Sequence, residues 1–208
     1  PILVLGASGF IGANLFRALK PTRDDVFGTS STPTPWRLSD FGCQNIEIVD
    51  LLIDHEVDQL VDKVKPKTIF NCVAYGAYSF QEDVDLIYRT NFFLVVKLLE
   101  RLSEMRIKSF VHAGTSSEYG RNAAGPSEEN QLAPNSHYAI SKASASNAIS
   151  FFGTEQKIPC VNLRIYSAYG PLEDSSRLIP QLFKKISVGD LPSFVDANIS
   201  RDFVYIDD

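Results

Sequence analysis

The first twelve residues of the chain constrain its fold more than any other stretch. The apolar run Ile2–Leu5 predicts a short buried strand, and glycines follow it at three-residue spacing. Apolar residues then recur at helical spacing from Phe10 onward. A strand, a glycine turn and a helix together place the helix N-terminus over a phosphate, so this stretch predicts a site for a dinucleotide pyrophosphate. The predicted cofactor contacts are Gly6, Gly9, Phe10, Ile11 and Gly12.

Each glycine has an expected task. Gly6 can make the tight turn, Gly9 lets the backbone approach the pyrophosphate, and Gly12 lets the helix pack closely on the strand. An ordinary βα turn that happens to be rich in glycine is the alternative. The position of the pattern, directly after a strand and at the start of a helix, favours the binding site.

Strands alternate with helices along the rest of the chain. This order predicts an α/β fold with a doubly wound parallel sheet and helices on both faces. The length of 208 residues suits one large domain. Further strands are expected at residues 25–29, 46–51, 68–74, 108–113 and 159–164, with short strands at 193–195 and 202–205. Helices are expected at residues 57–64, 85–105, 137–155 and 179–186.

Composition excludes several classes of function. Lys and Arg number 20 against 25 Asp and Glu, and no basic stripe is present, so a nucleic-acid binder is not expected. No apolar run reaches membrane-spanning length and no signal peptide is visible, so we expect a cytoplasmic protein without a membrane partner. The three cysteines and three histidines have neither disulfide nor metal-ligand spacing, so no metal site is expected.

The end of the second expected strand bears on the choice of cofactor. An NAD-binding unit usually carries an acidic residue there, which bonds the ribose 2′-hydroxyl. This chain has the hydroxyl run 29–32, with Arg37 not far beyond it. The pattern slightly favours NADP over NAD and makes Ser30 a predicted contact. The alternative is that the hydroxyl run only caps a loop.

Tyr138 and Lys142 lie four residues apart on the helix expected at 137–155, and therefore on one face of it. A free phenol is a poor base at neutral pH, but a nearby cation lowers its pKa. The pair is therefore a candidate general acid/base, although a solvated surface pair would have the same spacing. Thr115 follows the fifth expected strand and could bond the same substrate oxygen.

Together these residues resemble a known family. The shared set is Gly6, Gly9 and Gly12, Asp50-Leu51, Asn91, Thr115 with Tyr119-Gly120, Tyr138 with Lys142, Arg164 with Tyr169-Gly170-Pro171, and the run 200–205. The chain is similar to extended short-chain dehydrogenases/reductases, and more narrowly to the NAD(P)-dependent epimerase/dehydratase group that acts on nucleotide-diphosphate sugars. The resemblance covers essentially the whole chain and implies a Rossmann-like fold.

The resemblance implies roles for individual residues. Tyr138 would be the acid/base, Lys142 would lower its pKa while bonding the nicotinamide ribose, and Thr115 would be the helper hydroxyl. Asp50 would reach the adenine end, and Arg201 would meet the substrate diphosphate unless it forms an ion pair with Asp202 or Asp207. The remaining predicted contacts are Leu51, Ala74 and Asn91 for the cofactor, and Ser116, Ser117 and Ser167 for the substrate.

Departures from the family pattern narrow the expected reaction. Family 4,6-dehydratases carry an acid, usually Glu, two places after the catalytic Thr, where this chain has Ser117. Glu118 comes one place later, and we expect its side chain to point elsewhere. This favours a 4-ketoreductase or a 4-epimerase over a 4,6-dehydratase. A non-catalytic NAD(P)-sensing protein and a reductase of a non-sugar ketone are further alternatives.

The resemblance also bears on domain organisation and assembly. Residues 1–208 would form the NAD(P)-binding Rossmann domain, with the substrate-binding region beginning at about 171–208. Family members continue beyond this point, so we expect the C-terminal substrate-capping part to be largely missing from the sequence. The two long helices resemble those that pair in a four-helix interface, which implies a homodimer unless they only cover the sheet.

Overall fold

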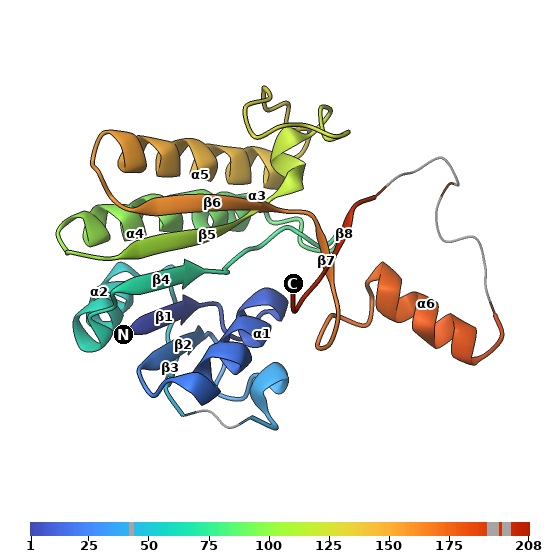
Figure 1. The fold of residues 1–208 in the computed structure, drawn as a ribbon, viewed down its shortest axis with the longest axis horizontal. Helices are drawn as coiled ribbons and strands as arrows, with labels where there is room; N and C mark the ends of the chain where they lie inside the picture. Colours follow the sequence, from blue (N-terminus) through green and yellow to red (C-terminus); the bar gives the residue numbers. More distant parts are fainter. Residues whose placement is uncertain (42–43, 191–195, 197–200) are drawn as a thin grey trace. The chain divides into compact units, whose positions relative to one another are not determined.

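The computed structural model describes residues 1–41, 44–190, 196 and 201–208. The chain divides into two units, Pro1–Ile165 and Tyr166–Asp208. The larger unit is built on one six-stranded sheet in the order β3-β2-β1-β4-β5-β6, and every neighbouring pair of strands is parallel (Figure 1). The fold is therefore the predicted Rossmann-like, doubly wound α/β sheet.

The strand order positions the site. The strands are β1 (Ile2–Leu5), β2 (Val26–Ser30), β3 (Ile46–Ile48), β4 (Thr68–Asn71), β5 (Ser109–Thr115) and β6 (Cys160–Ile165). From β1 the chain first builds outward through β2 and β3, and then returns to β4 on the other side of β1. Ligands bind such sheets in the crevice beyond the carboxyl ends of the strands, where the order reverses. Here that point lies between β1 and β4.

Helices cover both faces of the sheet. They are α1 (Phe10–Leu19), α2 (Asp54–Val64), α3 (Val84–Tyr88), α4 (Leu94–Ser103) and α5 (His137–Thr154). Apolar residues of α2, α4 and α5 share one buried cluster with Leu3 and Leu5 of β1. Val4 of β1 and Phe16 of α1 are also fully buried but lie outside that cluster. Val4 faces the other side of the sheet from Leu3 and Leu5, because alternate residues of a strand face opposite sides. The continuous apolar run of β1 thus reflects burial on both faces.

The helix expected at 85–105 is interrupted by a π-helical turn, Arg89–Phe93, between α3 and α4. Asn91 lies in this turn and is fully buried. Its Nδ2 donates to the Tyr75 carbonyl at 2.7 Å and its Oδ1 accepts from the Tyr75 N–H at 3.0 Å. Such turns commonly mark functional positions in helices. Helical periodicity does not predict this turn or the bonds that Asn91 makes from it to a loop 16 positions earlier in the sequence.

Other boundaries shift slightly from the prediction. β3 ends at Ile48, so Asp50 follows the strand instead of ending it, and β5 continues to Thr115. The smaller unit contains β7 (Ser167–Tyr169), α6 (Leu178–Ser187) and β8 (Phe203–Tyr205), with β7 and β8 paired in parallel. The strand expected at 193–195 lies outside the described residues. Among the helices that the structure describes, none is long and apolar enough to cross a membrane.

Candidate functional site

A cleft of about 300 Å³ opens at the carboxyl ends of the strands in the larger unit. Residues that follow β1, β2, β3 and β4 all contribute to its wall, as expected at the reversal point of the strand order. Six of the predicted cofactor residues line it: Gly6, Gly9, Ser30, Asp50, Leu51 and Ala74. These residues are up to 68 positions apart in sequence, and the sheet brings them to one cavity.

The glycine turn has the geometry that a phosphate cradle requires. Gly6 has φ of +75°, a left-handed conformation that side chains disfavour, and its N–H donates to Thr29 Oγ1 at 2.9 Å. A Cβ at Gly12 would overlap the Gly6 carbonyl, so only glycine lets α1 begin this close to β1. At Gly9 an added Cβ would meet only the Gly6 oxygen, at 3.3 Å. The space beyond Gly9 belongs to the cleft.

The start of α1 is open to an anion. Gly9 is the N-cap residue and has no side chain to bond the first N–H groups of the helix. The N–H groups of Phe10 and Ile11 in the first turn have no intrahelical acceptor, and the positive end of the helix dipole favours negative charge there. The cradle and the open helix start therefore fit the pyrophosphate of a dinucleotide.

The hydroxyl run 29–32, which begins within β2, is used mainly for bonds within the protein. Thr29 is buried and accepts from the Gly6 N–H at 2.9 Å. Ser30 Oγ donates to the Thr32 carbonyl at 2.7 Å and accepts from the Thr32 N–H at 3.1 Å. These two hydroxyls hold the loop, which is the alternative that the sequence left open. Ser31 lines the cleft, and Arg37 Nη1 donates to the Ser8 carbonyl at 3.3 Å.

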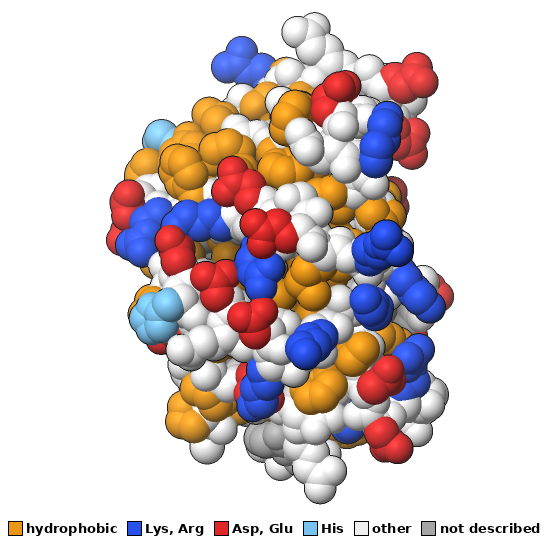
Figure 2. All heavy atoms as spheres, turned by 90° about the vertical axis from the view of Figure 1, so that its left-hand side faces the viewer, with side chains coloured by type: hydrophobic (Ala, Val, Ile, Leu, Met, Phe, Trp, Pro, Cys, Tyr) orange, Lys and Arg blue, Asp and Glu red, His pale blue; other side chains and the backbone are white. Residues whose placement is uncertain are grey.

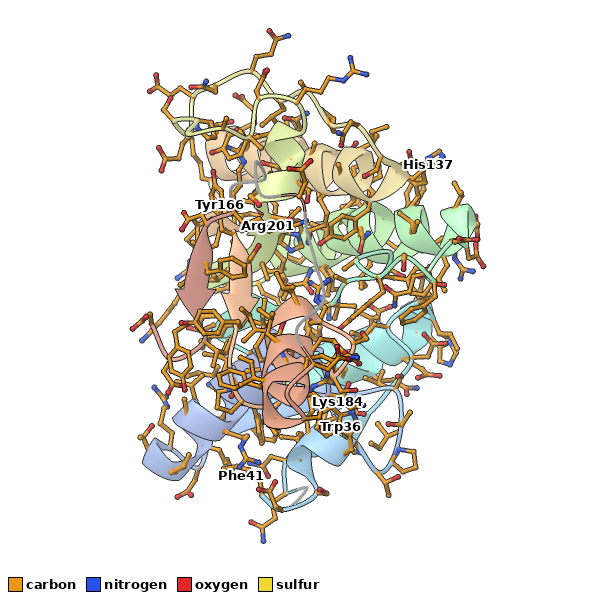
Figure 3. All side chains as sticks on the ribbon, turned by 90° about the vertical axis from the view of Figure 1, so that its right-hand side faces the viewer. Trp36, Phe41, His137, Tyr166, Lys184 and Arg201 are labelled. Carbon is orange, nitrogen blue, oxygen red and sulfur yellow. The ribbon has the colours of Figure 1, made fainter. Side chains whose placement is uncertain are left out.

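Figure 3 relates the two ends of the larger unit. Trp36 and Phe41 lie in the segment after β2, whereas His137 lies at the start of α5, at the opposite end of this unit in the view. The Arg37 guanidinium carbon is 4.3 Å from the centroid of the Trp36 ring. A dinucleotide on the glycine turn would therefore have its adenosine toward Trp36 and its nicotinamide toward α5.

Tyr138 lies against the loop that follows β4, and part of this loop lines the cleft. It is in the first turn of α5, which Ser136 caps by accepting the Ala139 N–H at 3.1 Å. A Cβ at Gly76 would lie 3.5 Å from Tyr138 Cδ2, and the neighbouring Tyr75 lines the cleft. The Asn91 Nδ2 donates to Ser141 Oγ at 3.0 Å. Asn91 thus ties the loop after β4 to the helix that carries Tyr138.

Lys142 is fully buried one turn after Tyr138. Its Nζ lies 2.9 Å from His112 Nε2 and donates to the Ala113 carbonyl at 2.6 Å. Burial lowers the pKa of Lys142 from the ordinary 10.5 to about 8, although the acidic groups of Glu118 and Cys72 oppose this shift. The predicted bond from Lys142 to the nicotinamide ribose stays a prediction.

Thr115 ends β5 and caps the short 3-10 turn Ser116–Tyr119. Its N–H donates to Glu118 Oε1 at 2.9 Å, and its Oγ1 accepts from the Ser117 N–H at 3.2 Å. The Thr115 O–H can still donate to a substrate oxygen. Ser116 and Ser117 lie in the same turn, and their predicted role as substrate contacts stays a prediction.

The Glu118 carboxylate is bonded to groups of the protein besides the Thr115 N–H. Its side chain is fully buried and forms an ion pair with Arg164, Nε to Oε2, at 2.9 Å. Asn162 Nδ2 donates to the same Oε2 at 3.0 Å, and the Arg164 guanidinium lies over the Tyr119 ring at 4.9 Å. The Glu118 carboxylate is thus bonded within the protein, and the expectation that it does not serve as a dehydratase acid stays a prediction.

Two buried residues of the site were not predicted from the sequence. Asn71 ends β4 and His112 lies on β5, and the two are partners in the strand register. Asn71 Nδ2 lies 3.1 Å from His112 Nδ1. Each residue alone, within an apolar strand-like run, resembles an ordinary satisfied core polar group. A polar residue in the middle of two adjacent expected strands was the only signal available.

Ser167 and Arg201 belong to the smaller unit. The Ser167 N–H donates to the Asp202 carbonyl at 3.1 Å, directly before β8. Arg201 is exposed, and within the part of the chain that the structure describes it forms no ion pair with Asp202 or Asp207. Both residues stay predicted substrate contacts.

The fold and the cradle define a dinucleotide-binding protein with a Tyr–Lys pair beside the cleft. The chain belongs to the NAD dependent epimerase/dehydratase family, whose model matches residues 2–208. It is 31% identical to an uncharacterized UDP-glucose epimerase of Bacillus subtilis (strain 168), over 100% of this chain and 69% of the relative. This family consists of NAD-dependent enzymes, so the chain is an enzyme of the nucleotide-sugar epimerase/dehydratase type.

Solved structures agree with this assignment. UDP-glucuronic acid 4-epimerase from Bacillus cereus, in complex with NAD, has 27% identity and a TM-score of 0.82, over 99% of this chain and 69% of that chain. dTDP-glucose 4,6-dehydratase from Bacillus anthracis, also in complex with NAD, has 25% identity and a TM-score of 0.83, over 99% of this chain and 67% of that chain. The present chain thus spans about two thirds of the length of these relatives.

Proposed function

We propose that the protein transfers a hydride at C4 of a nucleotide-diphosphate sugar, as a 4-epimerase or a 4-ketoreductase. The observation that carries the proposal is the placement of Tyr138 and Lys142, one turn apart on α5, beside the loop that ends the dinucleotide cleft. The similarity to a UDP-glucuronic acid 4-epimerase and to a named UDP-glucose epimerase supports chemistry at this carbon.

Each side chain of the site has a separate role in the proposed reaction. A bound dinucleotide supplies the acceptor or donor of the hydride. Tyr138 Oη takes the proton of the C4 hydroxyl in oxidation and returns it in reduction. The positive charge of Lys142 favours the phenolate of Tyr138 and so lowers the pKa of the phenol. Thr115 donates its O–H to the same sugar oxygen and fixes its position.

The alternative reaction, 4,6-dehydration, would need a further acid or base near the sugar. Glu118 is the nearest carboxylate to Thr115 in sequence, and it is buried in an ion pair with Arg164 and capped by the Thr115 N–H. A carboxylate held in this way cannot reach a sugar carbon without breaking its ion pair with Arg164, whose side chain is only 19% exposed. Ser116 and Ser117 offer hydroxyls, which are poor bases at neutral pH. This arrangement favours the epimerase or ketoreductase.

The test is Tyr138→Phe in the full-length protein. We expect turnover of the nucleotide sugar to fall by about a hundredfold or more, since the proton carrier is removed. Dinucleotide binding and the melting temperature should change little. Tyr88→Phe is the matched control, because Tyr88 OH bonds only His137 Nδ1 among the described partners, at 3.3 Å, on the exposed side of α3. Undiminished turnover in Tyr138→Phe would refute the assignment, and absence of turnover in the unmodified protein would point to a binding protein without catalysis.

The fate of the dinucleotide separates the two reactions. An epimerase keeps its dinucleotide through the catalytic cycle, whereas a ketoreductase must exchange it. Absorbance of the purified, denatured protein measures the bound nucleotide. Stoichiometric bound NAD, together with turnover in the absence of added nucleotide, would identify the epimerase and exclude the ketoreductase.

We further propose that Arg37 makes NADP the preferred dinucleotide. Its guanidinium lies 3.3 Å from the Ser8 carbonyl of the glycine turn, and no carboxylate stands at the end of β2. A planar guanidinium suits a 2′-phosphate. Arg37→Ala should weaken NADPH binding about tenfold and leave NADH binding unchanged, as measured by fluorescence titration. Tighter binding of NADH than NADPH by the unmodified protein would contradict the proposal.

A homodimer through α4 and α5 is the third part of the proposal. A shallow apolar depression on α4, α5 and the π-helical turn before α4 is lined by residues that include Phe92, Val96 and Phe151, and Phe151 is 51% exposed. Figure 2 shows hydrophobic side chains gathered on the upper part of one face of the molecule. Exposed apolar patches of this kind commonly mark interfaces. Phe151→Glu should yield a monomer in light scattering, whereas the control Phe80→Glu, at a 73% exposed loop residue, should not.

We also propose a cytoplasmic location. Cys72 and Cys160 are free thiols in the described structure, and free thiols are typical of proteins from reducing compartments. A fluorescent fusion of the full-length protein would locate it. A signal confined to the periplasm or the cell surface would contradict this part of the proposal.

A further inference from the structure

A buried chain of polar side chains leads from the sheet to Lys142. Asn71 at the end of β4, His112 on β5 and Lys142 on α5 are all buried, with exposed fractions of 1%, 0% and 0%. The contacts are 3.1 Å from Asn71 Nδ2 to His112 Nδ1 and 2.9 Å from His112 Nε2 to Lys142 Nζ. The proposed reaction uses Lys142 but assigns no task to the other two residues.

The backbone fixes the orientation of Asn71. Its Oδ1 accepts the Val73 N–H at 3.2 Å, so its amide nitrogen is the group that faces His112. An amide nitrogen only donates, and His112 Nδ1 must therefore accept. In a neutral imidazole that accepts at Nδ1, the hydrogen is on Nε2. The ring is held in place by stacking on Phe110, with 6.4 Å between centroids and 6° between planes.

We propose that His112, oriented by Asn71, is a positioning residue for Lys142. His112 presents an Nε2–H donor to the Lys142 Nζ and so favours the free amine of Lys142 over its ammonium. An amine has a lone pair that accepts this hydrogen, while one of its own hydrogens is donated to the Ala113 carbonyl at 2.6 Å. An ammonium has no lone pair, and one of its hydrogens would face the hydrogen on Nε2. The tautomer of His112 thus affects how readily Lys142 binds its third proton.

The other ionisable groups around Lys142 do not favour its free amine. Glu118 from the turn after β5 favours a positive charge on Lys142, and Cys72 from the segment after β4 would do so only as a thiolate. Glu118 is already paired with Arg164, and burial raises the pKa of the Cys72 thiol to about 12, so Cys72 is uncharged at neutral pH. Burial also lowers the pKa of His112 well below 6.5, which keeps the ring neutral. Tyr138 is the ionisable neighbour on the same helix.

The inference rests on the proposed function, because it assigns a part of the pH dependence of that reaction. The ammonium of Lys142 stabilises the phenolate of Tyr138, and its loss at high pH removes this effect. Asn71 and His112 would therefore set the alkaline limit of activity. A carboxylate in place of Asn71 would accept from His112 Nδ1–H, move the hydrogen away from Nε2 and favour the ammonium.

The first experiment needs no turnover and no substitution. Nitrogen-15 NMR of the full-length protein, with labelled histidine, reports which ring nitrogen of His112 carries the hydrogen. We expect the Nε2–H tautomer, unchanged between pH 6 and pH 8 since the ring stays neutral. The Nδ1–H tautomer, or a protonated ring in this range, would overturn the inference. A failure of the proposed reaction, seen as full activity in Tyr138→Phe, would leave this result unaffected.

The second experiment reverses the tautomer. Asn71→Asp keeps the shape of the side chain and the acceptor for the Val73 N–H. We expect the alkaline limb of the kcat/KM profile, and the midpoint of the Lys142 signal in NMR with labelled lysine, to rise by roughly one pH unit. Dinucleotide binding should not change. The matched control is Asn122→Asp, at an exposed loop residue. An unshifted limb in folded Asn71→Asp, or an equal shift in the control, would overturn the inference.

Discussion

Two regions of the larger unit build the site by different means. Around the glycine turn, between β1, α1 and β2, the groups proposed to bind the dinucleotide are backbone N–H groups, and residues without side chains leave room for the ligand. Around α5 the groups proposed to take part in the reaction are side chains, held by buried polar partners from β4, β5 and the turn after β5. The glycine turn itself is formed by consecutive residues, whereas contacts of the second region join residues 30 to 50 positions apart.

This difference predicts how each region responds to substitution. A site made of backbone is damaged by adding atoms, because a new Cβ overlaps a neighbour. A site made of buried side chains is damaged by removing a partner, because the remaining polar group is left without one. In the second region activity and stability can even move in opposite directions, since a buried amine is costly to the fold.

Lys142→Met tests whether activity and stability change in opposite directions, and its expected effect on turnover is the largest. Turnover should fall by about a thousandfold, because the cation beside Tyr138 is lost. Burial lowers the pKa of Lys142 from 10.5 to about 8, and this difference corresponds to roughly 3 kcal/mol. The variant should therefore unfold at higher denaturant concentration near pH 7 than the unmodified protein.

The sign of the pH dependence is fixed by the same pKa. Between pH 8 and 10.5 the unfolded chain binds a proton at Lys142 that the folded chain does not, so the stability of the unmodified protein rises with pH in this window. Below pH 8 the destabilisation caused by the buried, charged Lys142 is fully present. Denaturant melts of both proteins across this range should converge toward high pH. A variant that is less stable than the unmodified protein near pH 7 would contradict the comparison.

Glu118→Gln removes one member of a buried ion pair in the second region. The Arg164 side chain is 19% exposed, so its charge would be left largely without water. The free energy of unfolding should fall by about 3 kcal/mol, measured by denaturant titration. Glu104→Gln is the control, because Glu104 pairs with Arg101 at the surface and is 72% exposed. A change below about 0.5 kcal/mol is expected there. Equal effects at both sites would show that burial does not matter.

Gly12→Ala and Gly9→Ala separate packing from binding in the first region. The Cβ at Gly12 overlaps the Gly6 backbone, so this variant should lose about 1–3 kcal/mol of stability and also bind the dinucleotide more weakly. At Gly9, where φ is −79°, the Cβ meets only one atom at 3.3 Å. That variant should keep its melting temperature and lose dinucleotide affinity. Loss of stability in both variants would contradict the assigned tasks.

Thr29→Val has the smallest expected effect and tests a side chain within the backbone-built region. It leaves the Gly6 N–H without its acceptor at 2.9 Å, at a cost of about 1–2 kcal/mol. Thr29→Ser retains the oxygen and should be nearly neutral. Thermal melts with and without dinucleotide measure both effects. Identical stability of the two variants would mean that this hydroxyl does not hold the turn.

The sequence by itself predicted the parts of this protein that depend on near neighbours. Hydrophobic periodicity predicted the α/β alternation, and glycine spacing after a strand predicted the turn that lines the cleft at Gly6 and Gly9. These signals are local, because a strand, a tight turn and the first turn of a helix are formed by consecutive residues. The family, and the spacing of Tyr138 and Lys142 on one helix, followed from the same kind of pattern.

Only the tertiary structure decided which buried polar groups meet. The parallel register puts Asn71 beside His112, and the packing of α5 on the sheet brings Lys142 to that ring, 30 residues away in sequence. It also directed Thr29 to the glycine turn and Glu118 to Arg164. A buried polar group must find a partner, but the sequence does not say which one, because register and helix packing select it across the whole fold.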